Sequence, residues 1–342
     1  MGKCGARQRI NPKRIEQFAE LVKTFLTLGR PLNFYSFTGK DGIQTVASDM
    51  YPPLHAPEVI EFFFFACLHN YGFWHGKEKY EGPLFGTLDG KKVKGYDLLW
   101  KLLLRAVKND PYVFMPQRLA NMWLSEYCLI FSDDNGPIPL LISDERYDLT
   151  RAYGNWFGVE RMSGASTPAA LVAYANDHPK PLATLRMIIA DPNSGIPGYR
   201  EDPLAKKVLL LLMALTNRPE HFVIPEDDFP WDPIVDYHLM RLDLRMGHVI
   251  LPRAWREENV ERRFTSKERE EAIRAADYKA NRLLLNLLRN HGITMAEIDA
   301  LKCMARRFCP EIEKPDCAAC MFQSVCSQNT ELFQPVIRTT AY

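Results

Sequence analysis

Four cysteines near the C-terminus constrain this chain more than any other feature. They follow the spacing C-x7-C-x2-C-x5-C within eighteen residues and are Cys309, Cys317, Cys320 and Cys326. A cubane 4Fe-4S cluster offers four iron corners and accepts unequal gaps around one tight pair. Structural zinc sites usually combine two C-x2-C pairs. The spacing therefore favours an iron–sulfur cluster, and the alternatives are zinc or no metal. A disulfide frame is not expected in a cytosolic chain of this size.

Other cysteines are expected to be structural. Cys4, Cys67 and Cys128 stand alone in the N-terminal part, and the last two lie in apolar helical contexts. Such cysteines usually behave as small core residues. Cys303 precedes the four-cysteine loop on a helix and is the alternative ligand, in place of one of the four.

Composition sets wide limits on fold and partners. The 342 residues are 46% hydrophobic and carry a net charge of +1, which allows two lobes and does not indicate a global electrostatic grip on nucleic acid. The apolar stretches 61–68 and 208–215 are too short to span a bilayer. We expect no secretory signal and a monomeric, cytoplasmic protein without membrane contact, in a compartment where thiols stay reduced.

The hydrophobic periodicity predicts a mainly α fold with two helical lobes. Asp89-Gly90 between short apolar runs predicts a β-hairpin insertion near 84–93. Helices are expected over 13–28, 57–69, 95–110, 116–130, 141–156, 166–176, 181–190, 203–217, 236–247, 265–290 and a short segment ending near 307. The expected parts are an N-terminal helix and aromatic loop (1–55), a helical lobe (56–235), the 236–308 helices, the cysteine loop (309–326) and a tail (327–342).

A second constellation begins at Asp236. Leu239, Leu242 and Met246 fall on one apolar stripe of the following helix, and His238, Arg241, Arg245 and His248 fall on a basic one. Asp236 stands at the helix start, where a carboxylate is a good N-cap and is held ionised by backbone N–H groups. The same position suits a catalytic carboxylate that faces a developing positive charge. Both interpretations stay open on these residues alone.

The order of motifs resembles the endonuclease III branch of the helix-hairpin-helix DNA glycosylases. The resemblance consists of Val-Asp-x-His-x-x-Arg-x-x-x-Arg-x-Gly over 235–247, followed by the cysteine loop. It implies a helical glycosylase-like fold, a catalytic Asp236 and a 4Fe-4S cluster on the four cysteines. That family has six residues in the first gap of the loop, and this chain has seven.

A middle region resembles the queuosine salvage family. The resemblance consists of Phe73-Trp74, of Gly86-Thr-Leu-Asp-Gly-Lys-Lys-Val-Lys-Gly-Tyr-Asp-Leu-Leu-Trp100, and of Tyr199-Arg-Glu-Asp-Pro-Leu-Ala-Lys-Lys207 leading to Asp236-Tyr237. It implies release of a 7-deazaguanine base from a nucleoside or its monophosphate, with the Asp of Asp-Tyr catalytic. The members of that family lack the cysteine loop.

The segment near 190–217 resembles a helix-hairpin-helix but lacks the lysine of lyase-type glycosylases. Gly195-Ile-Pro-Gly198 is followed by Tyr-Arg-Glu-Asp, and Lys206 and Lys207 come later. Either lysine is a candidate Schiff-base amine or a phosphate or sugar contact. A released base needs an aromatic pocket, although aromatic residues in an α protein mostly belong to the core. The candidate substrate contacts are Phe73, Trp74, Trp156, Lys207, Tyr237 and His238.

The sequence is compatible with three functions. The leading hypothesis is a DNA glycosylase that hydrolyses a modified or damaged base from DNA, and the second is a salvage hydrolase of a 7-deazaguanine nucleoside. The third is a non-catalytic iron–sulfur protein that binds DNA. Two groups of cations are candidate phosphate contacts: Arg262, Arg263, Lys267 and Arg269, and Arg306, Arg307 and Lys314 around the loop.

Overall fold

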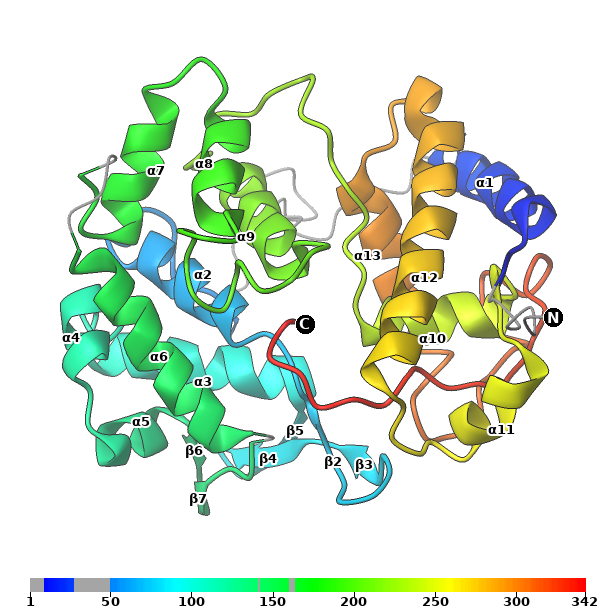
Figure 1. The fold of residues 1–342 in the computed structure, drawn as a ribbon, viewed down its shortest axis with the longest axis horizontal. Helices are drawn as coiled ribbons and strands as arrows, with labels where there is room; N and C mark the ends of the chain where they lie inside the picture. Colours follow the sequence, from blue (N-terminus) through cyan, green and yellow to red (C-terminus); the bar gives the residue numbers. More distant parts are fainter. Residues whose placement is uncertain (1–8, 28–49, 141, 160–163) are drawn as a thin grey trace, which may run out of the picture. The chain divides into compact units, whose positions relative to one another are not determined.

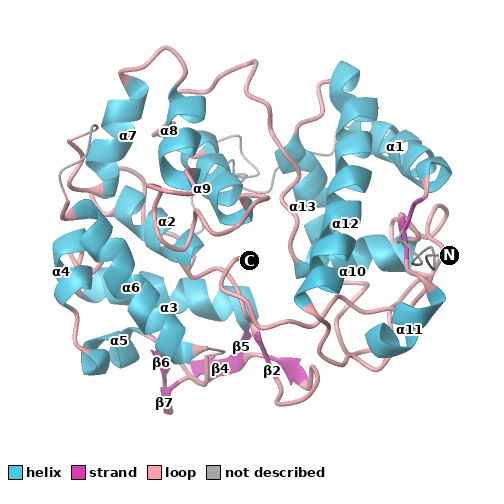
Figure 2. Ribbon diagram, viewed as in Figure 1, coloured by secondary structure: helices cyan, strands magenta, loops and turns pink. Residues whose placement is uncertain are grey.

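The computed structural model describes residues 9–27, 50–140, 142–159 and 164–342. Cys4 and the aromatic loop expected up to Asp49 lie outside these residues. Helices dominate the described chain, and its strands form only short two-stranded pairs (Figure 2). The prediction of a mainly α fold with a small β-hairpin is therefore confirmed.

The chain forms two compact units (Figure 1). Unit 1 comprises residues 1–34, 76–82 and 231–337, and unit 2 comprises residues 35–75, 83–230 and 338–342. Each unit is therefore assembled from segments that are far apart in the sequence. The last five residues return to unit 2 after the chain has completed unit 1.

Unit 2 is built around an apolar helix. Its helices are α2 (Val59–Leu68), α3 (Gly95–Asn109), α4 (Pro116–Asn121), α5 (Leu124–Ile130), α6 (Ser143–Phe157), α7 (Pro168–Asn176), α8 (Pro181–Ala190) and α9 (Lys206–Asn217). Helix α2 is apolar on all sides, and such a helix must be buried all round. Phe62, Phe63, Phe64 and Phe65 have no exposed surface, and α2 packs against α3, α7 and α9.

Short strands lie within residues 74–137, nearly all of them in unit 2. They are β2 (Trp74–His75), β3 (Gly82–Pro83), β4 (Phe85–Leu88), β5 (Lys91–Lys94), β6 (Ser132–Asp133) and β7 (Gly136–Pro137). Strands β4 and β5 pair antiparallel, with Leu88 opposite Lys91. Asp89 and Gly90 both have positive φ, as a two-residue turn of this kind requires. The hairpin forms where the Asp-Gly pair predicts it.

Two predicted helices differ clearly from the structure, and a helix over Arg253–Val260 was not predicted. The expected 203–217 helix begins only at Lys206, because Asp202 accepts hydrogen bonds from the backbone N–H groups of Leu204 and Lys206 and Ala205 adopts a φ of +52°. The expected 116–130 helix is broken at Met122, whose carbonyl accepts a hydrogen bond from the Tyr147 hydroxyl at 2.9 Å. In both cases a side chain forms hydrogen bonds with backbone groups that would otherwise belong to the predicted helix.

Unit 1 is organised around one long helix. Its elements are β1 (Arg9–Ile10), α1 (Pro12–Thr27), α10 (Tyr237–Met246), β8 (Val249–Ile250), α11 (Arg253–Val260), α12 (Lys267–Leu288), the 3-10 turn η1 (Arg289–His291) and α13 (Met295–Ala305). Helix α12 packs against α1 and α10, and strand β1 pairs antiparallel with β8. Helix α10 also packs against α13, so it lies within the core of this unit.

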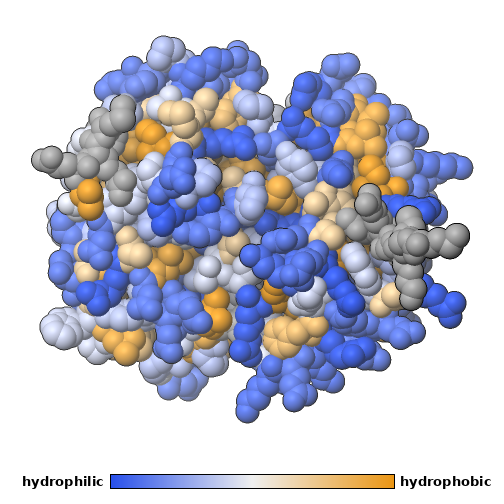
Figure 3. Space-filling model, in the orientation of Figure 1, coloured by the Kyte–Doolittle hydropathy of each residue, from blue (hydrophilic) through white to orange (hydrophobic). Residues whose placement is uncertain are grey.

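The visible face of the molecule is mostly hydrophilic, with apolar side chains in separate small groups (Figure 3). Scattered exposed apolar residues are normal on protein surfaces. None of the helices in the described part of the chain is long and apolar enough to cross a membrane.

Candidate active site and metal centre

Asp236 is the N-cap of α10. Its Oδ1 accepts hydrogen bonds from the backbone N–H groups of His238 at 2.8 Å and Leu239 at 3.0 Å. These bonds satisfy two of the N–H groups that a helix start leaves without a partner. They also fix the carboxylate at the positive end of the helix, where the ionised form is favoured. Asp236 is thus a rigid anionic group.

His238 is a neutral imidazole with a defined tautomer. The Arg241 guanidinium lies 3.1 Å from His238 Nδ1, and a guanidinium has only donors, so Nδ1 accepts and the ring proton resides on Nε2. Burial, which outweighs the neighbouring Asp236, lowers the pKa of His238 to about 4. The side chain keeps 25% of its surface exposed. His238 therefore offers an N–H donor two residues after Asp236.

A buried carboxylate from the cysteine loop meets this histidine. Glu311 Oε1 lies 3.5 Å from His238 Nδ1 and 3.6 Å from the Arg241 guanidinium. Its Oε2 accepts a hydrogen bond from the Tyr80 hydroxyl at 2.7 Å. Burial, reinforced by the Glu311 charge, raises the pKa of Tyr80 well above its usual value. The side chains of Glu311, Tyr80 and Arg241 are each about 3% exposed.

The four cysteines of the loop line one cavity of unit 1. The volume of this cavity is about 20 Å³, and Leu242, Met246 and Phe322 complete much of its apolar wall. Burial raises the pKa of the Cys326 thiol to about 11, and the other three cysteines add to the shift. Four thiols around one apolar space fit a cationic inorganic centre, because a bound metal favours the thiolate form. Cys303, on α13, is not among the residues that line this cavity.

A site for a single metal ion would need at least three ligand side chains close together. Within the described ranges, no group of three or more His, Cys, Asp or Glu side chains is gathered as a single metal ion would require.

Arg245 connects α10 to the cysteine loop. Its guanidinium donates hydrogen bonds to Cys309 Sγ at 3.2 Å, to the Pro310 carbonyl at 2.7 Å and to the Leu332 carbonyl at 2.8 Å. Burial lowers the pKa of Arg245 from its usual value, and the neighbouring Cys309 opposes that shift. Arg241 and Arg245 are therefore buried, and both contact residues of the cysteine loop.

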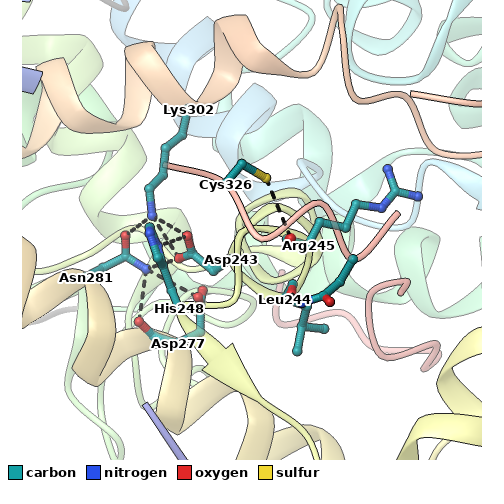
Figure 4. A network of polar contacts seen from close by, with 9 residues as sticks. Asp243, Leu244, Arg245, His248, Asp277, Asn281, Lys302 and Cys326 are labelled. Carbon is teal, nitrogen blue, oxygen red and sulfur yellow. Dashed lines mark hydrogen bonds and ion pairs between the residues drawn. The ribbon is translucent and has the colours of Figure 1, made fainter. Parts of the chain in front are cut away.

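Asp243, on α10, is the centre of a buried polar network (Figure 4). Lys302 Nζ contacts both of its carboxylate oxygens, at 2.6 and 2.8 Å, while Asn281 and His248 donate to it at 2.7 and 2.8 Å. Although burial opposes the shift, Lys302 and His248 hold the pKa of Asp243 far below its usual value. Burial and the Asp243 charge raise that of Asp277 well above its usual range. This network joins α10, α12 and α13.

The remaining candidate substrate contacts lie mostly in unit 2. Phe73, Trp74 and Trp156 are buried, and the Trp156 indole N–H donates to the Ser194 carbonyl at 2.8 Å. Tyr237 is buried in unit 1 beside His238, with ring centroids 4.2 Å apart. The structure thus brings Asp236, Tyr237, His238 and the cysteine loop into one unit and holds the other three aromatics in the second.

Lys206 and Lys207 contact the C-terminal end of α2. Lys207 Nζ donates to the Leu68 carbonyl at 3.0 Å and the Thr340 carbonyl at 2.7 Å, and Lys206 Nζ donates to the Asn70 carbonyl at 2.9 Å. Cations are favourable at a helix C-terminus, where carbonyl groups lack helical partners. Burial, with the nearby Lys206 charge, lowers the pKa of Lys207 to about 7.

The candidate phosphate contacts differ in their surroundings. Arg263, Lys267 and Arg269 pair with Glu261, Glu271 and Glu258, and Arg262 lies over the Phe333 ring at 4.8 Å. Acidic partners weaken the case for this group as a phosphate contact. Arg306, Arg307 and Lys314 are exposed beside the cysteine loop.

The comparison with protein-family models gives one relevant match. Residues 51–186 match the model described as queuosine salvage protein. The matched segment covers less than half of the chain, and no match to a helix-hairpin-helix glycosylase family accompanies it. No curated protein matches the chain. The comparisons therefore support the queuosine-salvage part of the resemblance.

Sequence reasoning missed several residues of this site. Glu311 stands in the loop between two cysteines, Tyr80 lies 231 residues earlier, and neither belongs to a periodic pattern. The Asp243–Lys302 pair is separated by 59 residues. The one available signal was a charged residue, Asp243, on a helix that also carries the apolar stripe, since a charge buried there needs a partner.

Proposed function

We propose that this protein hydrolyses the N-glycosidic bond of a 7-deazaguanine nucleoside or nucleotide and releases the free base. The match of residues 51–186 to the queuosine salvage model carries the proposal. The Asp236-Tyr237 pair and the Tyr199–Lys207 segment agree with it. The family match favours a small nucleoside substrate over a base in DNA.

Asp236 is the proposed catalytic carboxylate. As the C–N bond breaks, its electron pair goes to the base and positive charge grows on the sugar. A water oxygen then bonds to the sugar carbon, and the proton that the water loses balances the one that the base gains. The N-cap hydrogen bonds of Asp236 support this role, because a preorganised anion stabilises the developing charge without having to reorient. Asp236 would also orient the water.

His238 is the proposed hydrogen-bond donor to the substrate. Because Nδ1 accepts from Arg241, the Nε2–H group of His238 can donate a hydrogen bond to a ring nitrogen, a carbonyl oxygen or a sugar oxygen. A neutral donor of this kind stabilises negative charge on a leaving base. Tyr237 is the proposed aromatic contact of the same site. Lys207 is fully buried and donates to the Leu68 and Thr340 carbonyls, so its role as a phosphate or sugar contact stays a prediction.

We propose that Cys309, Cys317, Cys320 and Cys326 hold a 4Fe-4S cluster. When bound, the cluster would bind the four thiolates and cross-link the loop to itself, which is a structural contribution. The cavity that the four cysteines share supports this assignment. Zinc is the alternative, and absorbance near about 400 nm with metal analysis separates the two.

Base release from DNA is the second candidate function. The observation that favours it is the order of Asp236 helix and cysteine loop, which the DNA glycosylases share, together with exposed Arg306, Arg307 and Lys314 beside the loop. Salt-dependent binding to duplex DNA would support this function, or a non-catalytic DNA-binding function, in preference to hydrolysis of a nucleoside. The direct test is a base-release assay by mass spectrometry with both substrate classes.

A further inference from the structure

The first gap of the cysteine loop contains one buried acid. Three carboxylates lie between Cys309 and Cys317, at Glu311, Glu313 and Asp316, and only Glu311 is buried. A carboxylate is almost never buried without partners. Its burial therefore points to specific contacts, and the loop offers Glu313 as an exposed acid of the same kind for comparison.

The contacts of Glu311 lead to the start of α10. Oε2 is held by the Tyr80 hydroxyl at 2.7 Å, and Oε1 faces the Arg241 guanidinium at 3.6 Å. Gln334 Oε1 accepts a hydrogen bond from the same guanidinium nitrogen at 2.9 Å. The other terminal nitrogen of Arg241 lies 3.1 Å from His238 Nδ1. Glu311 and Gln334 together thus constrain the orientation of Arg241, and Arg241 determines the tautomer of His238.

We propose that Glu311 is a positioning residue of the active site, which transmits the loaded state of the cysteine loop to His238. A loop closed by its metal centre holds Glu311 against Tyr80 and Arg241, because Cys309 is only two residues away. An empty loop releases Glu311, and His238 then loses the fixed Nδ1 contact that keeps its proton on Nε2. The metal centre therefore controls base release although it takes no part in the bond cleavage. This inference rests on the proposed function, since it assigns His238 to the substrate.

The matched test compares Glu311→Gln with Glu313→Gln. Glutamine keeps the size of the side chain and can still accept from Tyr80, but it no longer offsets the Arg241 charge. We expect Glu311→Gln to lower kcat/KM for base release by about tenfold or more, while its iron content equals that of Glu313→Gln. Its thermal midpoint should fall below that of Glu313→Gln, because the buried Arg241 loses a counter-charge. Equal activity of the two variants would overturn the proposal, as would an activity loss that follows iron loss in proportion.

A second readout does not depend on activity. In protein labelled with ¹⁵N-histidine, the His238 signals should report a neutral ring with the proton on Nε2. Glu311→Gln, or removal of the metal from the wild type by a chelator, should shift these signals, and Glu313→Gln should not. Unchanged His238 signals after both treatments would reject the coupling. If the signals shift but no substrate is hydrolysed by the wild type, the positioning role stands and the proposed function fails.

Discussion

The Arg245 guanidinium donates a hydrogen bond to the sulfur of Cys309 at 3.2 Å and one to the next residue's carbonyl at 2.7 Å. Both partners lie in the cysteine loop, and Arg245 lies two turns after Tyr237 on the same helix. Helix α10 therefore contacts the loop at two places. Near the C-terminal end of the helix, Arg245 bonds to the loop, and near its N-terminal end, Glu311 of the loop contacts His238 and Arg241. A change in the loop has two routes to the candidate active site.

Replacing Arg245 should weaken the metal centre before it affects the fold. Arg245→Lys keeps the charge but loses the planar set of donors that reaches Cys309 and two carbonyls. We expect iron content to fall, and loss of absorbance near about 400 nm in air to become several-fold faster. Arg256→Lys, at an exposed pair with Glu331, is the control and should behave as the wild type. Equal cluster lifetimes in the two variants would show that Arg245 does not support the cluster.

Asp236 allows its capping and catalytic roles to be separated. Asparagine caps helices about as well as aspartate, whereas alanine loses about 1 kcal/mol. Asp236→Asn should leave the free energy of unfolding almost unchanged and lower kcat by roughly 100-fold or more. Asp236→Ala should lose activity and stability together. Denaturant unfolding and base-release kinetics measure the two effects, and near wild-type release by Asp236→Asn would remove Asp236 from the mechanism.

The Asp243–Lys302 pair should dominate the stability of unit 1. Lys302→Met leaves a buried carboxylate with its main counter-charge gone, which typically costs about 3–5 kcal/mol. Asp243→Asn in the same chain should recover part of that loss, because the uncompensated charge disappears. Urea unfolding of the single and double variants tests this. A single variant that loses less than about 1 kcal/mol, or a double variant that is no better, would contradict the network's assigned role.

Lys207 predicts how stability depends on pH. Its pKa in the folded protein is about 7, and that of an unfolded lysine is about 10.4. Between these values the unfolded chain binds more protons, so the Lys207 contribution raises stability as pH increases, by roughly 1 kcal/mol per pH unit. Lys207→Met should flatten the rise measured between about pH 7.5 and about pH 9. The control Lys91→Met, at an exposed lysine, should keep the wild-type slope of unfolding free energy against pH. An unchanged slope in Lys207→Met would refute the lowered pKa of Lys207.

Local patterns predicted most helices of this fold and the hairpin, whereas α11 and the other strand pairs were missed. The Asp-Gly turn after β4 and the N-cap at Asp236 depend on neighbours within a few residues, and the sequence states them directly. The late start of α9 was not visible, because it depends on Asp202 taking backbone groups that a helix would otherwise use. The helix break at Met122 depends on Tyr147, from another helix.

The candidate site was predictable only in part, for a similar reason. Asp236 and the four cysteines form short motifs with their own spacing. Tyr80, Glu311 and Lys302 act through single contacts with residues far away in the chain, and no periodicity marks such a contact. The arginines of α10 were read as one basic stripe, whereas burial gives Arg241 and Arg245 separate partners.

Asp236 is the residue proposed to drive release of a 7-deazaguanine base from a small substrate. Quantitative mass spectrometry of free base tests this role, with metal-loaded wild type and Asp236→Asn given 7-deazaguanine nucleosides, their 5′-monophosphates, and duplex DNA that contains modified bases. We expect free base from a nucleoside or its monophosphate with the wild type, a roughly 100-fold loss with Asp236→Asn, and little release from DNA. Release from DNA alone, or release from the nucleoside that survives in Asp236→Asn, would contradict it.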